Sequence, residues 1–185
     1  LLGAGSGQDI TTAVGNTGLG YRAMYEHTEG DNNVAVGYRA LYNMNPASNV
    51  DMYNTAVGYD AGLYVSTGVQ NTIIGGTAGD ALTTGSYNVA LGYKALSRED
   101  TGNSNVAIGY YALEALNYDG SGYNVAVGHS AGATVSTGVQ NTIIGAEAGD
   151  ALTTGNHNIA FGFRALSTED TGNNSVAIGY YALNK

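Results

Sequence analysis

Apolar and polar positions alternate over short distances along this chain, and the same pattern returns at a fixed interval. The phrase at residues 88–92, Asn-Val-Ala-Leu-Gly, ends in a glycine that serves as an anchor. Eight of the ten intervals between equivalent glycines are 17 residues long, and the other two are 21 and 19. Such a period is typical of a protein built from stacked, similar coils. The anchor glycines are Gly3, Gly20, Gly37, Gly58, Gly75, Gly92, Gly109, Gly128, Gly145, Gly162 and Gly179.

The columns around the anchor are as regular as its spacing. A β-branched residue stands three places before the anchor, an apolar residue one place before it, and alanine three places after it in every coil but the first. Because β-branched residues favour strands, the Asn-Val-Ala-Leu segment predicts one short strand per coil, and residues 93–96 predict a second. Asparagine stands four places before the anchor, at Asn16, Asn33, Asn54, Asn71, Asn88, Asn105, Asn124, Asn141 and Asn158.

Two short strands and two turns per coil predict an all-β fold, a parallel β-solenoid of about eleven coils. At a spacing of ~4.8 Å between coils, the rod would be roughly 50 Å long. Residues 1–185 would form one solenoid segment of a longer fibre. Four places after the anchor, pairs of Gly alternate with pairs of Leu or Met, so the larger unit is four coils. Residues 54–113 align with residues 124–183 at 44 identical positions of 60, which indicates a duplication of that unit.

The predicted strand is apolar on both faces, with Val34 and Val36 on one face and Ala35 on the other. A strand that is buried on both faces reads as a continuous apolar run. Since a coil of 17 residues encloses little interior, we expect a neighbouring chain to cover the alanine face in a homotrimer. The alternative is a monomeric solenoid in which the alanines fill a narrow core.

Composition and charge limit the possible partners. The chain has 15 acidic and 6 basic residues, a net charge of −9, which argues against nucleic acid and anionic membranes. No apolar run approaches the ~20 residues of a membrane span. With no cysteine, a zinc finger or a disulfide framework is excluded. We expect neither a metal nor a cofactor.

Candidate catalytic groups are explained better by the repeat. The string Gly-His-Ser-Ala-Gly at 128–132 matches a nucleophile motif, but its glycines occupy repeat columns. His27, His129 and His157 show no ligand spacing and are interpreted as surface substitutions. The acidic pairs at 99–100 and 169–170 are interpreted as solvated turns. The prediction is therefore that the chain is not an enzyme.

Tyrosine is enriched in this chain, and some of the tyrosines are candidates for ligand contacts. Tyr111 and Tyr181 fall in a column that should face solvent, where an exposed ring could stack on sugars. The two longer coils carry insertions at 42–53 and 114–123 that contain Tyr42, Tyr53, Tyr118 and Tyr123, and loops on a rigid scaffold are common contact sites. These six tyrosines are the candidate glycan or receptor contacts. Further tyrosines directly follow the anchor and predict a stacked ladder: Tyr21, Tyr38, Tyr59, Tyr93, Tyr110 and Tyr180.

Residues 54–62 (Asn-Thr-Ala-Val-Gly-Tyr-Asp-Ala-Gly) and 33–41 (Asn-Val-Ala-Val-Gly-Tyr-Arg-Ala-Leu) resemble repeats of bacteriophage tail-fibre proteins. Residues 175–179 (Ser-Val-Ala-Ile-Gly) are similar to the head repeats of trimeric autotransporter adhesins, whose coils are somewhat shorter. The resemblance covers essentially the whole chain. It implies a trimeric, left-handed parallel β-roll that projects from a virion or a cell and engages a surface.

The leading prediction is a structural segment of a phage tail fibre, located on the virion, that contributes to attachment to a host-cell surface or glycan. A bacterial trimeric adhesin or a self-assembling extracellular filament is the alternative. A glycan-degrading tailspike would need two separated acids in a cleft. An ice-binding solenoid would need an unbroken threonine array, and Thr67, Thr84 and Thr101 form only a short one.

Overall fold

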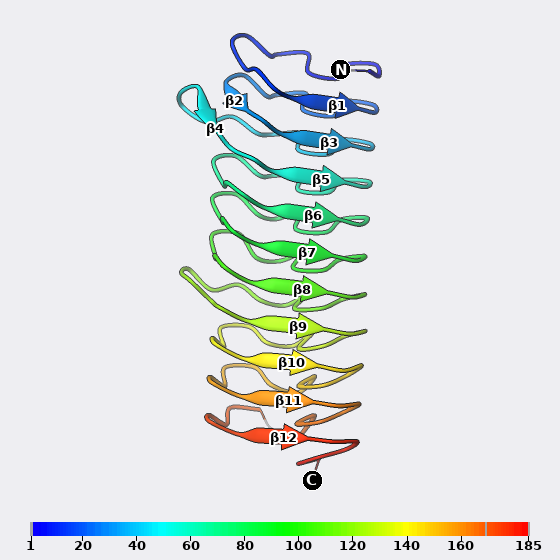
Figure 1. The fold of residues 1–185 in the computed structure, drawn as a ribbon, viewed down its shortest axis with the longest axis vertical. Helices are drawn as coiled ribbons and strands as arrows, with labels where there is room; N and C mark the ends of the chain where they lie inside the picture. Colours follow the sequence, from blue (N-terminus) through cyan, green and yellow to red (C-terminus); the bar gives the residue numbers. More distant parts are fainter. Residues whose placement is uncertain (1, 169, 185) are drawn as a thin grey trace.

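A computed structural model describes residues 2–168 and 170–184, and it confirms the predicted parallel β-solenoid, with about nine turns (Figure 1). Successive coils contribute their strands to a ten-stranded parallel sheet that runs the length of the stack. No helix among the described residues is long and apolar enough to cross a membrane. The strands of this sheet are β1 (Thr17–Leu19), β3 (Val34–Val36), β5 (Thr55–Val57), β6 (Thr72–Ile74), β7 (Val89–Leu91), β8 (Val106–Ile108), β9 (Val125–Val127), β10 (Thr142–Ile144), β11 (Ile159–Phe161) and β12 (Val176–Ile178).

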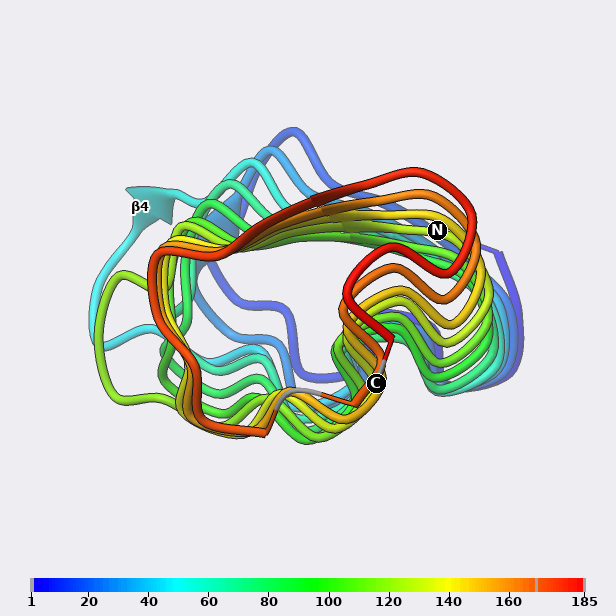
Figure 2. The same cartoon turned by 90° about the horizontal axis from the view of Figure 1, so that it is seen from below.

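The two longer coils keep the register of the stack by extending loops outward. In the 21-residue coil, β4 (Val50–Asp51) pairs with β2 (Gly30–Asp31) in a small second sheet. In the 19-residue coil, a single bridge joins Asn103 to Ser121. Seen along the rod, both loops project on the same side, beyond the outline of the neighbouring coils (Figure 2). The insertions therefore change the surface and leave the coil stacking intact.

The predicted second strand at 93–96 is wrong, because this segment forms a turn. Lys94 and Leu96 both have φ near +54°, in the left-handed region, which breaks an extended strand. The turn starts at the anchor Gly92, whose φ is +136°. A Cβ at this position would lie 2.6 Å from the carbonyl carbon of Gly109 in the next coil. Only glycine fits where the backbones of successive coils approach so closely.

The asparagine column forms a buried ladder inside the solenoid. The backbone N–H of Asn71 donates to Oδ1 of Asn54 at 2.9 Å, and its Nδ2 donates to the carbonyl of Gly85 at 2.8 Å. Each amide thus links its own coil to the next, and a fully bonded polar network can be buried without a penalty for lost hydrogen bonds. Eight of these residues are completely buried: Asn33, Asn54, Asn71, Asn88, Asn105, Asn124, Asn141 and Asn158.

The strand alanines point into the solenoid. Ala35 is completely buried within the single chain, whereas Val34 and Val36 on either side of it face outward and are half-buried. The expectation that a neighbouring chain covers the alanine face is therefore wrong. Residues of the returning chain, such as Leu41 and Met44, belong to the same buried cluster, so one coil encloses a narrow interior of its own.

The alternation of Gly and Leu four places after the anchor has a packing reason. Where this place holds Gly62, the facing strand carries Ile73 instead of alanine, and a Cβ on Gly62 would lie 3.0 Å from Cδ1 of Ile73. Gly132 and Ile143 repeat this relation in the second module, at 2.8 Å. Near the glycines, the large side chain that fills the core comes from the strand. In the other coils it comes from the Leu or Met four places after the anchor, in the segment that returns to the next strand. The packing therefore stays dense throughout.

Two polar side chains occupy a column of the interior that elsewhere holds Met44, Leu82 or Leu116. His27 and Glu99 are both completely buried, so their interpretation as surface and solvated residues is wrong. The Glu99 carboxylate accepts hydrogen bonds from the N–H groups of Gly102 at 2.7 Å and Tyr118 at 3.3 Å. The position seven places after the anchor lies in the core of the coil. The polar residue types of His27 and Glu99 gave no indication that these side chains are buried.

Candidate functional site

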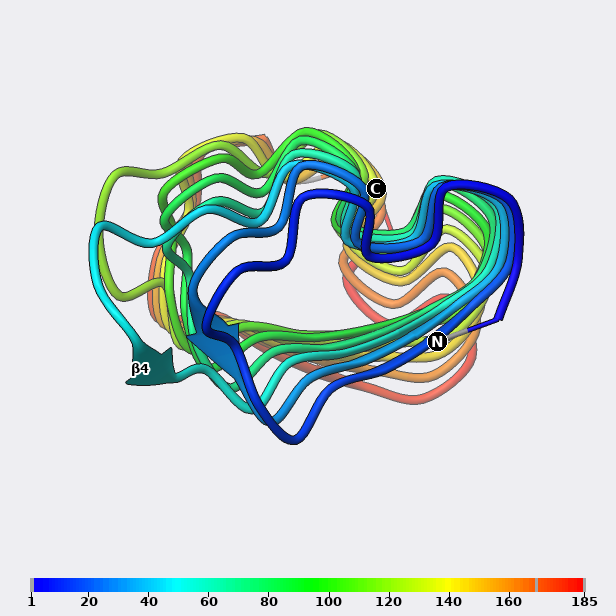
Figure 3. The same cartoon turned by 90° about the horizontal axis from the view of Figure 1, so that it is seen from above.

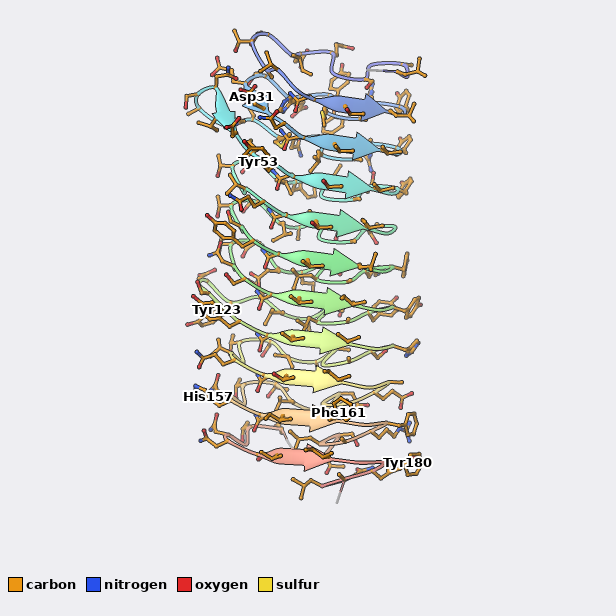
Figure 4. The ribbon with its side chains drawn as sticks, viewed as in Figure 1. Asp31, Tyr53, Tyr123, His157, Phe161 and Tyr180 are labelled. Carbon is orange, nitrogen blue, oxygen red and sulfur yellow. The ribbon has the colours of Figure 1, made fainter. Side chains whose placement is uncertain are left out.

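The outer face of the long sheet carries mainly apolar side chains, with threonine as the first residue of β1, β5, β6 and β10. Two columns of side chains, one on each side of the buried alanines, point outward along the whole rod (Figure 4). Near one end, Phe161 is 52% exposed and Ile178 is 67% exposed. Among the described residues, the outward side chains of this face are half-buried or exposed. A contiguous apolar surface of this kind is typical of an interaction site. Aromatic residues border it on both edges.

The predicted ladder of rings after the anchor is present at one edge of the sheet. Tyr21 stacks on Tyr38 at 5.2 Å between ring centroids, and Tyr38 stacks on Tyr59 at 5.1 Å. Gly76 and Ala146 interrupt the series. We call this set the turn-side ladder; its members are Tyr21, Tyr38, Tyr59, Tyr93, Tyr110, His129, Phe163 and Tyr180.

Cationic side chains rest against the turn-side ladder. The guanidinium of Arg39 lies 5.1 Å from the ring of Tyr38 and forms two hydrogen bonds with the carboxylate of Asp60, at 2.8 and 2.5 Å. This paired carboxylate raises the pKa of Arg39 further above its ordinary value. Arg164 likewise bonds to Glu147 and lies over Phe163. Charge pairs and cation–π contacts therefore link successive rungs along this edge.

Tyr111 and Tyr181, two of the predicted contact residues, belong to the same edge. Tyr111 packs edge-on against Tyr110 at 4.3 Å, and Tyr181 packs edge-on against Tyr180 at 4.5 Å. The hydroxyl of Tyr181 also accepts a hydrogen bond from Arg164 at 3.2 Å. Both rings thus extend the turn-side ladder into a second column, where Tyr111 is half-buried and Tyr181 is exposed.

Tyr42 and Tyr118 lie elsewhere. Tyr42 stacks on Tyr25 at 5.2 Å, and its pKa is raised, chiefly by desolvation. Tyr118 is half-buried against the hydrophobic core, and its N–H bonds to Glu99. The structure therefore does not gather the six predicted tyrosines into one site.

Tyr53 and Tyr123 belong to a row that the sequence analysis missed. Each stands directly before a ladder asparagine, and so do Tyr87 and His157. All four are exposed, and the three labelled in Figure 4 lie along the edge of the sheet opposite to Tyr180. The two insertions lie between an anchor glycine and the next asparagine, so positions counted forward from the anchor do not align in the longer coils. When positions are counted backward from the asparagine, the four rings fall in one column. We call Tyr53, Tyr87, Tyr123 and His157 the alternate row.

Two partly buried aspartates each have a second carboxylate nearby, Asp60 for Asp80 and Glu147 for Asp150. Burial raises the pKa of Asp80 and of Asp150, which occupy equivalent positions in the two modules. Among the residues that the structure describes, no three His, Asp or Glu side chains are grouped as metal ligands. Glu169, part of the second acidic pair, lies outside the described residues.

The fold and its exposed rows define a parallel β-solenoid with one apolar face between two aromatic edges. The end-on view shows the coils of this solenoid stacked along the rod (Figure 3). Comparison with protein-family models, with curated proteins and with solved structures finds no match for this chain.

Proposed function

We propose that this chain is a structural segment of a bacteriophage tail fibre, carried on the virion, that contributes to attachment to a host-cell surface. Three chains, each a left-handed solenoid of about eleven coils, would assemble side by side. The segment acts through rigidity and surface contacts, and it has no catalytic role.

The observation that carries this proposal is the uncovered apolar face of the long sheet. Val106 and Val125 lie on this face near the middle of the rod, directly opposite each other in the register of β8 and β9. A flat strip of β-branched side chains tends to associate, because burying it removes apolar surface from water. Three such strips packed around a common axis would cover one another along their whole length.

The resemblance of the repeat to tail-fibre proteins supports the location, and the net charge of −9 is compatible with a particle that avoids nucleic acid. The stacked coils support a shaft, because each coil bonds to its neighbours through backbone and asparagine hydrogen bonds. A bacterial adhesin would share this architecture, so attachment to cells is tested separately from assembly.

Native mass spectrometry and light scattering test the assembly. A particle of three times the chain's own 18.9 kDa is expected, and a stable particle of one chain would overturn the proposal. The double substitution Val106→Asp/Val125→Asp should yield separate chains with an unchanged circular-dichroism spectrum. Thr84→Asp, in an exposed turn, is the matched control and should leave the mass unchanged. Binding of the labelled particle to bacterial cells then tests attachment.

A further inference from the structure

The alternate row places one aromatic ring on every second coil. Tyr53, Tyr87, Tyr123 and His157 belong to the coils of β5, β7, β9 and β11, and the coils between them carry Gln70, Ser104 and Gln140 in the same column. This two-coil rhythm continues across the inserted loop of the 19-residue coil. Its regularity is a property of the stacked structure, since the sequence intervals between the rings are unequal.

Backbone hydrogen bonds keep the column in register. The N–H of Tyr87 donates to the carbonyl of Val69 at 3.0 Å, and the N–H of His157 donates to the carbonyl of Val139 at 3.0 Å. Each rung is therefore one sheet spacing from the next, and successive rings of the row are roughly 9.6 Å apart. The turn-side ladder is different, because its stacked neighbours are 5.1 to 5.5 Å apart and leave no room between them.

The backbone conformation disfavours aromatic residues at this position. Tyr53, Tyr87, Tyr123 and His157 have φ values of +54°, +62°, +50° and +59°. The left-handed region disfavours residues with bulky side chains, and Gly15 and Asn174 in the same column are types that tolerate it. No stacking partner for these four rings is found among residues 2–168 and 170–184. Packing within the chain therefore does not account for them.

We propose that the alternate row binds a neutral, β-1,4-linked polysaccharide lying parallel to the fibre axis. In an extended chain of this linkage each sugar is turned over relative to its neighbour, so every second sugar presents the same face. The repeating disaccharide spans about the same length as two coils. Alternate sugars then stack on the rings, while the amides of Gln70 and Gln140 and the hydroxyl of Ser104 meet the hydroxyl groups of the sugars between them.

The charge distribution selects a neutral glycan. The chain carries a net charge of −9, and four of its cationic side chains are engaged with rings of the opposite edge. Beside the alternate row, the hydroxyl of Tyr53 donates to the carboxylate of Asp51 at 3.0 Å. An acidic polysaccharide would meet the like charge of Asp51 here, which disfavours its binding.

Titration calorimetry of the full chain with cellohexaose and with N-acetylated chitohexaose tests this inference, which rests on the proposed attachment function. At least one of the two should bind, whereas maltohexaose, whose α-1,4 linkage curves the chain, should not. Tyr87→Ala and Tyr123→Ala should each weaken binding about tenfold, because each removes the binding free energy of one stacked ring. Tyr64→Ala, an equally exposed tyrosine outside both rows, should have no effect.

A second variant tests the spacing itself. Gln70→Tyr/Tyr87→Gln keeps the number of rings in the column but moves one ring by a single coil, onto a backbone with a similar φ of +56°. Binding should weaken about as much as in Tyr87→Ala, because the moved ring no longer meets the same sugar face. Unchanged affinity would overturn the inference, since aromatic content alone would then explain binding.

The remaining outcomes separate this inference from the proposed function. If neither hexasaccharide binds while the particle still attaches to cells, the row is not a glycan site and the fibre proposal stands. If the ring substitutions change the mass of the particle, the row belongs to an interface between chains and the inference is overturned. Loss of cell attachment together with a single-chain mass would refute the proposed function itself.

Discussion

Residues 54–113 and residues 124–183 build two successive four-coil stretches of one solenoid, and 16 of their 60 aligned positions differ. Every apolar side chain of the first stretch that is completely buried has the identical residue at the aligned place in the second. Three differences fall on buried positions: Asp60 against Ser130, Leu63 against Ala133, and Asn105 against Ser175. The other differences lie on half-buried or exposed positions.

The comparison shows that the interior of a coil tolerates far less change than its surface. A coil has only a few inward columns, and each inward side chain touches the coils above and below, so one change disturbs three coils. On the two aromatic edges, rings are replaced by other rings: Tyr59 by His129, Tyr87 by His157, and Tyr93 by Phe163. The exposed Tyr64, outside these edges, is replaced by Thr134. The aromatic edges are thus common to both stretches even though the particular residues differ.

The largest effect is expected from a side chain in the anchor column. Gly75→Ala and Gly145→Ala should each cost more than about 4 kcal/mol, because the added Cβ overlaps the backbone of the next coil at 2.6 Å from its carbonyl carbon. Since the interiors of the two stretches are alike, the two losses should be equal. Urea unfolding of both variants measures them.

The matched control for these variants is the neighbouring position. Gly76→Ala should change stability by less than about 0.5 kcal/mol, because its Cβ would make ordinary contact, at 3.4 Å, with Tyr93 and its φ is not positive. The second stretch already has Ala146 there. A large loss in Gly76→Ala, or a small one in Gly75→Ala, would contradict the account of coil contact.

A smaller effect is expected from the strand isoleucines. Ile73→Ala should destabilise the chain by about 3 kcal/mol, because it leaves a cavity opposite Gly62 and Gly79. Adding Gly79→Leu should restore part of the loss, since Leu96 occupies the equivalent place with a similar φ. A double-mutant cycle measures the coupling between the two sites. If the effects of the two substitutions on stability are additive, the side chains at positions 73 and 79 do not fill the same space in the core.

The smallest effect concerns the buried carboxyl of Glu99, whose pKa is raised above its ordinary 4.5, mainly by burial. A raised pKa in the folded state stabilises the fold below the unfolded pKa, and this contribution is lost as pH rises through the folded pKa. As the pH rises above about 4.5, the wild type should therefore lose stability relative to Glu99→Gln. Thermal unfolding at several pH values measures the difference. Parallel curves for the two proteins would contradict this assignment, and Glu114→Gln, at a surface ion pair with Arg98, is the control.

Much of the fold could be predicted because each coil has the same kind of residue at the same position relative to the anchor glycine. The anchor glycines and the β-branched column predicted the strand of each coil, and the ring ladder followed from Tyr21, Tyr38 and Tyr59 at one coil spacing. The sites were less predictable. Tyr118 was expected at the surface of an insertion and is half-buried, whereas Tyr87 was missed although it belongs to the same row as Tyr53 and Tyr123.

The sequence by itself determined the period, the strand that each period contains and the duplication of the four-coil unit, because these are properties of order along the chain. Only the tertiary structure decided which face of the strand points inward. Val34 and Ala35 are both apolar, and the choice depends on the returning wall of Ala40 and Leu41, which leaves room for a methyl group and not for a larger side chain at most strands. It also decided that Glu99 is buried and that four distant rings form one row, because both facts arise from how the coils close and stack.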